Sequence, residues 1–185
     1  MFVKIKKLDS SYEEETLRLY ADSLKYDNYF QSAFGEVKVD SNLYKTYRQA
    51  VEYMLKEGRC YGAFVKDVLI GCILTVDYDL LRSGSTEVYD MFFGDATAYM
   101  DAIRVYNDTV PGDVEFMVAI TVTPAHQHKG VASKLLKKYC KTVAAGTTVV
   151  TDCYHCDRPH LFTRNGFNGV DLQGEKIFTI GVRRF

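Results

Sequence analysis

The stretch VTPAHQHKGVASKLL (residues 122–136) decides the fold of this chain. It continues an apolar run rich in β-forming residues, DVEFMVAITV (residues 113–122), which predicts a strand. After a short loop, apolar residues recur at helical spacing and predict a helix to about residue 143. These residues are Val131, Leu135, Leu136, Tyr139 and Val143. We therefore expect a strand, a glycine-bearing turn and a helix in direct succession.

The turn in this stretch has the properties of an anion site. The first N–H groups of a helix have no intrahelical acceptor, and the helix dipole adds partial positive charge at the same end. Gly130 lets the main chain come close to a ligand, and Ala132 keeps the next turn slim. Lys129 and His128 can add positive charge. The expected guest is a diphosphate.

The pattern Gln-x-x-Gly-x-Ala (residues 127–132) is preceded by Val-x-Pro and followed by an amphipathic helix. It resembles the acetyl-CoA pyrophosphate loop of the GCN5-related N-acetyltransferase (GNAT) superfamily. The phosphate loop of nucleotide triphosphatases is excluded because Gly-x-x-x-x-Gly-Lys-Ser/Thr is absent, and a dinucleotide fingerprint because Gly-x-Gly-x-x-Gly is absent. The alternative without a ligand is an ordinary strand–turn–helix corner.

The composition indicates one globular domain over residues 1–185. Hydrophobic residues make up 47% and charged residues 25%, and the net charge of −1 gives no general attraction to nucleic acid or to an anionic membrane. The apolar runs are too short to span a bilayer, and the first residues, MFVKIKKLDSSYEEE, lack the apolar core of a signal peptide. We therefore predict a cytoplasmic protein that binds neither nucleic acid nor membrane, with a homodimer as one option.

The chain has five cysteines, and an odd number without an export signal favours reduced thiols. Cys153 and Cys156 form a lone C-x-x-C, with His160 close behind. No second ligand pair completes a tetrahedral metal site, and the motif lies too late in the chain for a thioredoxin-like redox site. We expect buried cysteines at a strand end and no metal.

The rest of the chain predicts a mixed α/β sheet. Strands are expected at residues 2–8, 59–66, 68–76, 113–122, 147–152, 167–172 and 176–183. Helices are expected after a cap at residues 9–11, from Ser41 to Gly58, once or twice within 88–106, at 131–143 and at 157–165. With an insert at 77–112, this order resembles the GNAT fold. The resemblance implies a mostly antiparallel sheet of about six to seven strands, a splayed fourth and fifth strand pair and flanking helices.

The resemblance also implies an activity: transfer of an acetyl group from acetyl-CoA to a primary amine by direct attack in a ternary complex. The acceptor expected is a small molecule, with a peptide less favoured. Strand residues would pair with the pantetheine arm through their main chain, and amides of the turn would hold the diphosphate. The cofactor-binding residues implied are Ile120, Thr121, Val122, Gln127, His128, Lys129, Gly130, Val131 and Ala132.

Glu115 is the first candidate for the catalytic base. An alkylammonium group with a pKa of about 10.4 must lose a proton before it can attack, so a base or a water relay is useful. Glu115 is a charged residue inside an apolar strand, and family members often carry a glutamate at about this place. The alternative is a glutamate at the solvent-facing start of the strand. Asp113, His155 and His160 are weaker candidates.

The usual proton donor to the departing CoA thiolate is missing. Many relatives have a tyrosine four residues before a Gly-Phe pair. Gly166 and Phe167 match the pair, but Phe162 stands at the tyrosine position and has no proton to give. Tyr154 is the substitute candidate. This departure leaves open a CoA-binding module that senses acyl-CoA without catalysis, and also transfer of another acyl group or transfer to an oxygen.

The acceptor is not specified by a motif. Aromatic residues gather in the loop at 26–40 and in the insert, where they could line a cleft for an apolar or cationic amine. Aromatic residues that cover the core beneath a long loop are the simpler interpretation, and we favour it.

Overall fold

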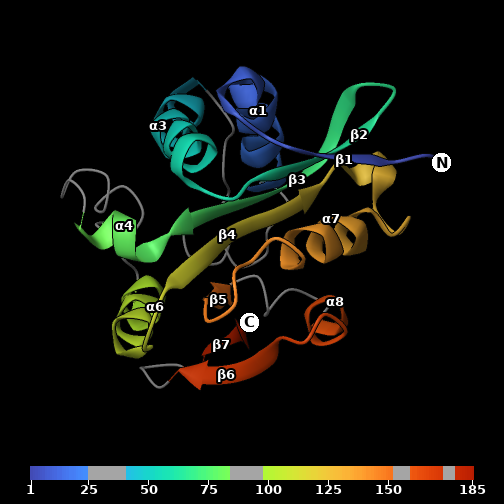
Figure 1. Cartoon of the computed structure of the whole chain (residues 1–185). Helices are drawn as coiled ribbons and strands as arrows, with labels where there is room; N and C mark the ends of the chain where they lie inside the picture. Colours follow the sequence, from blue (N-terminus) through green and yellow to red (C-terminus); the bar gives the residue numbers. More distant parts are fainter. Residues whose placement is uncertain (25–40, 84–97, 152–158, 173–177) are drawn as a thin grey trace. The chain divides into compact units, whose positions relative to one another are not determined.

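The structure is a computed structural model of the chain (Figure 1), and it describes residues 1–24, 41–83, 98–151, 159–172 and 178–185. In this described part, seven strands form one sheet in the order β1-β2-β3-β4-β5-β7-β6. The strands are β1 (Lys4–Lys7), β2 (Tyr61–Val65), β3 (Val68–Asp77), β4 (Val114–Val122), β5 (Thr148–Thr151), β6 (Asn168–Leu172) and β7 (Phe178–Arg184). β4 and β5 pair in parallel, whereas β1–β2, β2–β3, β5–β7 and β6–β7 are antiparallel. The predicted mixed, mostly antiparallel sheet is confirmed.

Helices and two short 3-10 turns connect the strands. They are η1 (Ser10–Tyr12), α1 (Glu13–Leu24), α3 (Ser41–Glu57), α4 (Tyr78–Ser83), α6 (Ala98–Thr109), η2 (Pro124–His126), α7 (Val131–Cys140) and α8 (Pro159–Thr163). Within the described part, no helix is both long enough and apolar enough to cross a membrane.

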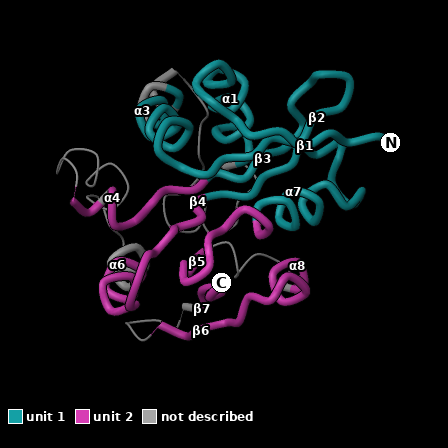
Figure 2. Tube along the Cα trace, in the orientation of Figure 1, with its two compact units in different colours: residues 1–74, 119–139 teal, residues 75–118, 140–185 magenta. Residues whose placement is uncertain are grey.

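The chain divides into two compact units (Figure 2). Unit 1 comprises Met1–Leu74 and Ala119–Tyr139, and unit 2 comprises Thr75–Val118 and Cys140–Phe185. β3 and β4 each contribute residues to both units. The single domain expected from the sequence stays a prediction.

Unit 1 is built on a β-hairpin and two packed helices. β2 and β3 are joined by Lys66 and Asp67, whose positive φ angles of 48° and 62° suit the tight turn of a twisted hairpin. α1 starts behind Asp9, whose carboxylate accepts the N–H of Ser11 at 2.9 Å. Arg48 of α3 forms ion pairs with Glu13 and Glu14 of α1. The core of unit 1 includes Leu8, Leu17, Val51, Met54, Ile73, Leu135 and Leu136.

Unit 2 is built on the first part of β4 with β5, β7 and β6. β5 lies between β4 and β7, with residues 148–151 in register with 114–117 on one side and with 181–184 on the other. Phe162 of α8 packs edge-to-face on Phe167 at a centroid distance of 5.7 Å. The core of unit 2 includes Tyr78, Ile103, Phe116, Met117, Val149, Val150, Phe162, Phe167 and Ile180.

Two elements differ from the sequence-based prediction. α7 ends at Cys140 and not near Val143, because the β-branched Thr142 and Val143 are poor helix formers and a turn begins at Lys141. α4 was not predicted at all. α6 lies in the region where one or two helices were expected and ends at Thr109. The loop at 26–40, the first part of the expected insert helices and the residues between the last two expected strands lie outside the described residues.

Candidate functional site

β4 ends in a turn that several hydrogen bonds hold in place. The N–H of Thr123 donates to the carbonyl of Ile70 on β3 at 2.9 Å, which ties the first residue after β4 to the sheet. Oγ1 of Thr123 lies 2.9 Å from Nδ1 of His126, and the N–H of His126 donates to the carbonyl of Thr123 at 2.9 Å. These bonds fix the direction in which the chain leaves β4.

Two side chains of the predicted loop turn back onto its own backbone. Nε2 of Gln127 donates to the carbonyl of Val122 at 3.1 Å, and the N–H of Gln127 donates to the carbonyl of Pro124 at 3.3 Å. Nζ of Lys129 donates to the carbonyl of Ala125 at 2.7 Å. Gln127 therefore braces the turn, and Lys129 holds its positive charge over the carbonyl end of η2.

The start of α7 has the backbone geometry of an anion site. His128 and Gly130 both have positive φ angles, 60° and 76°, and a Cβ placed on Gly130 would meet no atom within 4 Å. The first bond into the helix runs from the N–H of Lys134 to the carbonyl of Gly130 at 3.1 Å. The N–H groups of residues 131–133 therefore stand at the open end of the helix. The buried side chain of Val131 anchors this end. The exposed turn and these donors fit a diphosphate.

Gly71 on β3 is a supporting residue that the sequence reasoning missed. A Cβ at this position would lie 2.8 Å from the carbonyl oxygen of Thr121 and 3.1 Å from Cγ2 of Val122. It would also lie 3.4 Å from Cδ1 of Leu135 on α7. Only glycine lets the end of β4 pack this closely on β3. A glycine within the apolar run VLIGCILTV was the available signal for a close backbone approach.

The end of β4 presents different main-chain groups to its two edges. The carbonyl of Thr121 points toward Gly71 on β3. Because successive carbonyls of a strand point to opposite edges, Ile120 and Val122 present theirs to the other edge. The described pairing with β5 covers residues 114–117, and β4 runs on to Val122. The carbonyl of Val122 accepts Nε2 of Gln127, as described above. The contacts of Ile120, Thr121 and Val122 with pantetheine stay predictions, as does the splay of the pair.

Glu115 is buried near the start of β4. Its side chain is 5% exposed, and Oε1 accepts a hydrogen bond from Oγ1 of Thr75 at 2.7 Å. Thr75 lies on β3 and is fully buried. The alternative of a glutamate facing solvent at the strand start is therefore wrong. Sequence reasoning missed Thr75, because nothing in the sequence shows which residue of β3 lies beside Glu115.

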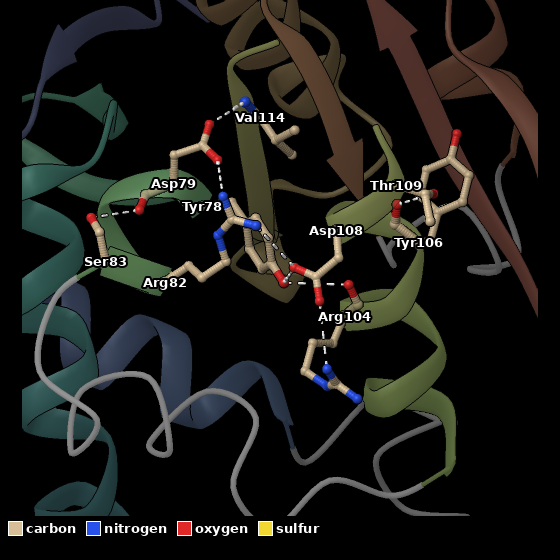
Figure 3. Close-up of polar contacts among 9 residues, drawn as sticks. All are labelled: Tyr78, Asp79, Arg82, Ser83, Arg104, Tyr106, Asp108, Thr109 and Val114. Carbon is tan, nitrogen blue, oxygen red and sulfur yellow. Dashed lines mark hydrogen bonds and ion pairs between the residues drawn. The ribbon is translucent and has the colours of Figure 1, made fainter. Parts of the chain in front are cut away.

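A residue of α4 holds the start of β4, and α6 in turn contacts α4 (Figure 3). Oδ2 of Asp79 accepts the N–H of Val114 at 3.2 Å. The hydroxyl of Tyr78 donates to Oδ1 of Asp108 at 2.9 Å, and Oδ2 of Asp108 accepts from Nη1 of Arg104 at 3.5 Å. Within the insert, α4 is thereby bonded both to α6 and to the residue next to Glu115.

The remaining predicted residues fall into two groups. Tyr154, His155, Cys153 and Cys156 lie outside the described residues. His160 is exposed, and Phe162 is fully buried in α8. Burial raises the pKa of the Cys72 thiol and so works against thiolate chemistry there. Among the described residues, no group of three or more His, Cys, Asp or Glu side chains could hold a metal ion.

Comparisons with known proteins agree with this fold. A model of the acetyltransferase (GNAT) family matches residues 23–167. The structure is similar to the PaiA N-acetyltransferase of Thermoplasma acidophilum in complex with coenzyme A, at 14% identity over 100% of both chains and a TM-score of 0.58. It is also similar to arylalkylamine N-acetyltransferase 2 of Aedes aegypti, at 12% identity over 100% of this chain and 99% of that chain and a TM-score of 0.66.

A third similar structure is the polyamine N-acetyltransferase of Drosophila melanogaster, an enzyme that forms N-acetylagmatine. It is 12% identical over 100% of both chains, with a TM-score of 0.63. No curated protein matches the sequence significantly. At these identities, the solved structures show a shared fold, and the family match rests on the sequence itself.

Proposed function

The chain belongs to the acetyltransferase (GNAT) family, and we propose that it transfers the acetyl group of acetyl-CoA to the primary amine of a small molecule, by direct attack in a ternary complex. The observation that carries the proposal is the turn after β4. Positive φ angles at His128 and Gly130, open space in front of Gly130 and the first amides of α7 together fit a diphosphate. Acetyl-CoA supplies the activated thioester.

In this proposal, the chain holds the cosubstrate at two places. The turn residues His128, Lys129, Gly130, Val131 and Ala132 bind the diphosphate through their amides, with Gln127 bracing the turn from behind. Ile120 and Val122, with Thr121 between them, offer main-chain groups to the pantetheine arm as an added strand would. Fixing the thioester at both places is what aligns it for attack by an amine.

Glu115 acts as the base that removes a proton from the ammonium form of the acceptor. The proton passes to the carboxylate directly or through one water, and the neutral amine becomes the nucleophile. Tyr154 is our candidate for the group that returns a proton to the thiolate, because Phe162 at the usual place has no hydroxyl. A peptide remains the less favoured acceptor.

Amines are the acceptor class that the comparisons favour. Two of the similar structures are named for arylalkylamines and for polyamines, and the second forms N-acetylagmatine. We therefore propose tryptamine, spermidine and agmatine as first probes. The cytoplasmic location and the homodimer stay predictions, which cell fractionation and sedimentation would test.

A direct experiment measures CoA release with a thiol reagent. The protein is incubated with acetyl-CoA and each of the three amines, and CoA binding is measured separately by calorimetry. Amine-dependent release of CoA supports the proposal. No association at millimolar CoA would refute it.

The base has its own test. Glu115→Gln should lower the rate at pH 7 by about 100-fold or more, with a smaller loss at high pH, where the amine is already neutral. Glu52→Gln on α3, where the side chain is exposed, is the matched control and should leave the profile unchanged. If Glu115→Gln keeps the wild-type pH–rate profile, the assignment of the base is wrong.

A second candidate function follows from one observation. Phe162 is fully buried against Phe167 and offers no proton at the position where many relatives have tyrosine. A module that binds acyl-CoA without turnover would tolerate this change. Tight CoA binding with no amine-dependent release, for acetyl-CoA and for longer acyl-CoA thioesters, would favour this sensor. Release only with a longer acyl group would indicate transfer of another acyl group.

A further inference from the structure

A buried hydrogen bond links the candidate base to the neighbouring strand. The hydroxyl of Thr75 on β3 donates to Oε1 of Glu115 on β4 at 2.7 Å, a short distance of the kind that a hydroxyl makes with a carboxylate. The Thr75 side chain is 0% exposed and Glu115 is 5% exposed. With so little water near them, this bond is stronger than its surface equivalent, and losing one partner is expensive.

Thr75 places a hydroxyl between apolar residues of a buried strand. Its neighbours Leu74 and Val76 are apolar and fully buried, and valine has nearly the same shape as threonine. A buried hydroxyl is unfavourable unless it is hydrogen-bonded, so the apolar residue would be the simpler choice at this position. The bond to Glu115 gives the hydroxyl a partner that valine could not provide.

We propose that Thr75 is a positioning residue for Glu115, an inference that rests on the proposed function of Glu115 as base. By holding Oε1, the hydroxyl fixes the rotation of the carboxylate about its last side-chain bond. By donating to the charged form, it also keeps the carboxylate ionised to lower pH than an apolar neighbour would allow. The first effect aims the carboxylate at the bound ammonium group, and the second keeps it in the form that can accept a proton.

Three other charged groups on the elements around Glu115 have partners of their own. Asp77, at the end of β3, accepts the N–H of Leu80 at 2.8 Å, and Asp79 accepts the N–H of Val114 at 3.2 Å. On the β5 side, Val149 is in register with Glu115 and with Arg183 of β7. Arg183 donates to the carbonyl of Asn165 and stacks on Phe185. These groups are unchanged in the variants below, so a shifted profile reports on Thr75.

The test compares four variants of the full chain with wild type. Thr75→Val removes the hydroxyl at constant shape, Thr75→Ala removes it with the methyl group, and Thr75→Ser keeps it. Thr16→Val is the matched control, because Thr16 is also fully buried and its Oγ1 has no hydrogen-bond partner among the residues that the structure describes. For each, kcat and kcat/KM with agmatine, spermidine or tryptamine, whichever turns over, are measured from pH 5 to 10, and CoA binding by calorimetry.

Loss of the hydroxyl should move the acidic limb of the kcat/KM profile to higher pH by about one unit, given the strength of a hydrogen bond to a charged group. At a fixed pH on that limb the rate should fall about tenfold, with CoA binding kept. Thr75→Ser and Thr16→Val should keep the wild-type limb. If Thr75→Val is insoluble, the comparison of Thr75→Ala with Thr75→Ser gives the same answer.

Failure of this inference differs from failure of the proposed function. If Thr75→Val and Thr75→Ala keep the wild-type limb while Glu115→Gln abolishes it, Glu115 is the base and Thr75 has a structural role only, which overturns the inference. If Thr75→Ser shifts the limb as far as Thr75→Val, the hydroxyl is not responsible, and the inference also fails. If Glu115→Gln itself keeps the wild-type profile, Glu115 is not the base, and the inference about Thr75 falls with that assignment.

Discussion

Two glycines with left-handed backbone angles allow the effect of a substitution on CoA binding to be separated from its effect on backbone strain. Gly130, before α7, has a φ of 76°, and Gly146, before β5, has a φ of 91°. A Cβ on either would meet no atom within 4 Å. Alanine at a left-handed position costs about 1–2 kcal/mol, of which about 0.4–1 kcal/mol is offset because alanine also restricts the unfolded chain. Gly130→Ala and Gly146→Ala should therefore each lose about 1 kcal/mol of unfolding free energy.

Glutamate at the same positions adds a charge to the same strain. Two like charges 4 Å apart repel by about 1 kcal/mol in water and by about 4 kcal/mol at an effective dielectric constant of 20. A diphosphate held at Gly130 carries at least two such charges, so even the water limit gives about 2 kcal/mol, or about 30-fold in Kd. Gly130→Glu should therefore weaken CoA binding at least tenfold, whereas Gly146→Glu should leave it unchanged.

The assay is calorimetry with CoA at two salt concentrations, beside urea unfolding of each variant. Added salt should reduce the effect of Gly130→Glu, because the repulsion at an exposed turn is screened. Two results would refute the reasoning: wild-type affinity in Gly130→Glu, or an equal loss of affinity in Gly146→Glu. The first result would show that the diphosphate does not bind at this turn. The second would show that the loss of affinity comes from general damage to the fold.

Three further changes test the packing and the ionisation of the fold. Gly71→Ala puts a methyl group 2.8 Å from the carbonyl oxygen of Thr121, so urea unfolding should show a loss of about 1–3 kcal/mol of unfolding free energy. Wild-type stability would show that the two strands can move apart at this point. Burial raises the pKa of Tyr47 to about 12, above its ordinary value. Its contribution to stability is therefore complete below about pH 10 and is lost as the pH rises toward 12, so Tyr47→Phe should make the alkaline fall in Tm shallower, and an identical fall would contradict this. Phe162→Ala should cost about 3–5 kcal/mol because the ring is fully buried, whereas Phe2→Ala should stay within about 0.5 kcal/mol of wild type; equal stabilities in urea would contradict the packing.

The turn after β4 could be predicted because its signals are local. A proline ends the strand, a glycine supplies the positive φ, and apolar residues at helical spacing give the inner face of α7. The positive φ of His128 has no such signal. Val143 continues the helical spacing but lies beyond the end of α7, because spacing indicates which residues share a face and does not show where a helix ends.

Contacts between strands could not be predicted, because they depend on register. Glu115 stood out as a charge within an apolar run, yet the sequence left open whether it was buried. In the structure it contacts Thr75 of β3 and lies in register with Val149 of β5, and both residues are far from it in the chain. Thr75 and Gly71 carried signals of their own, a hydroxyl and a glycine in an apolar strand, but the partner of each became evident only with the pairing of β3 and β4.

The short helix α4 shows how a weak local signal can matter for the site. Its six residues are too few for a periodic pattern, and its start depends on Asp77, whose carboxylate accepts the N–H of Leu80. Once formed, α4 places Asp79 on the N–H of Val114, the residue before Glu115. Thr75 holds the Glu115 side chain from the strand that leads into α4. The backbone and the side chain of the candidate base are therefore positioned by one continuous segment, residues 75–79. Under the proposed function, changes in the insert should therefore alter the pH dependence of the reaction while CoA binding is kept.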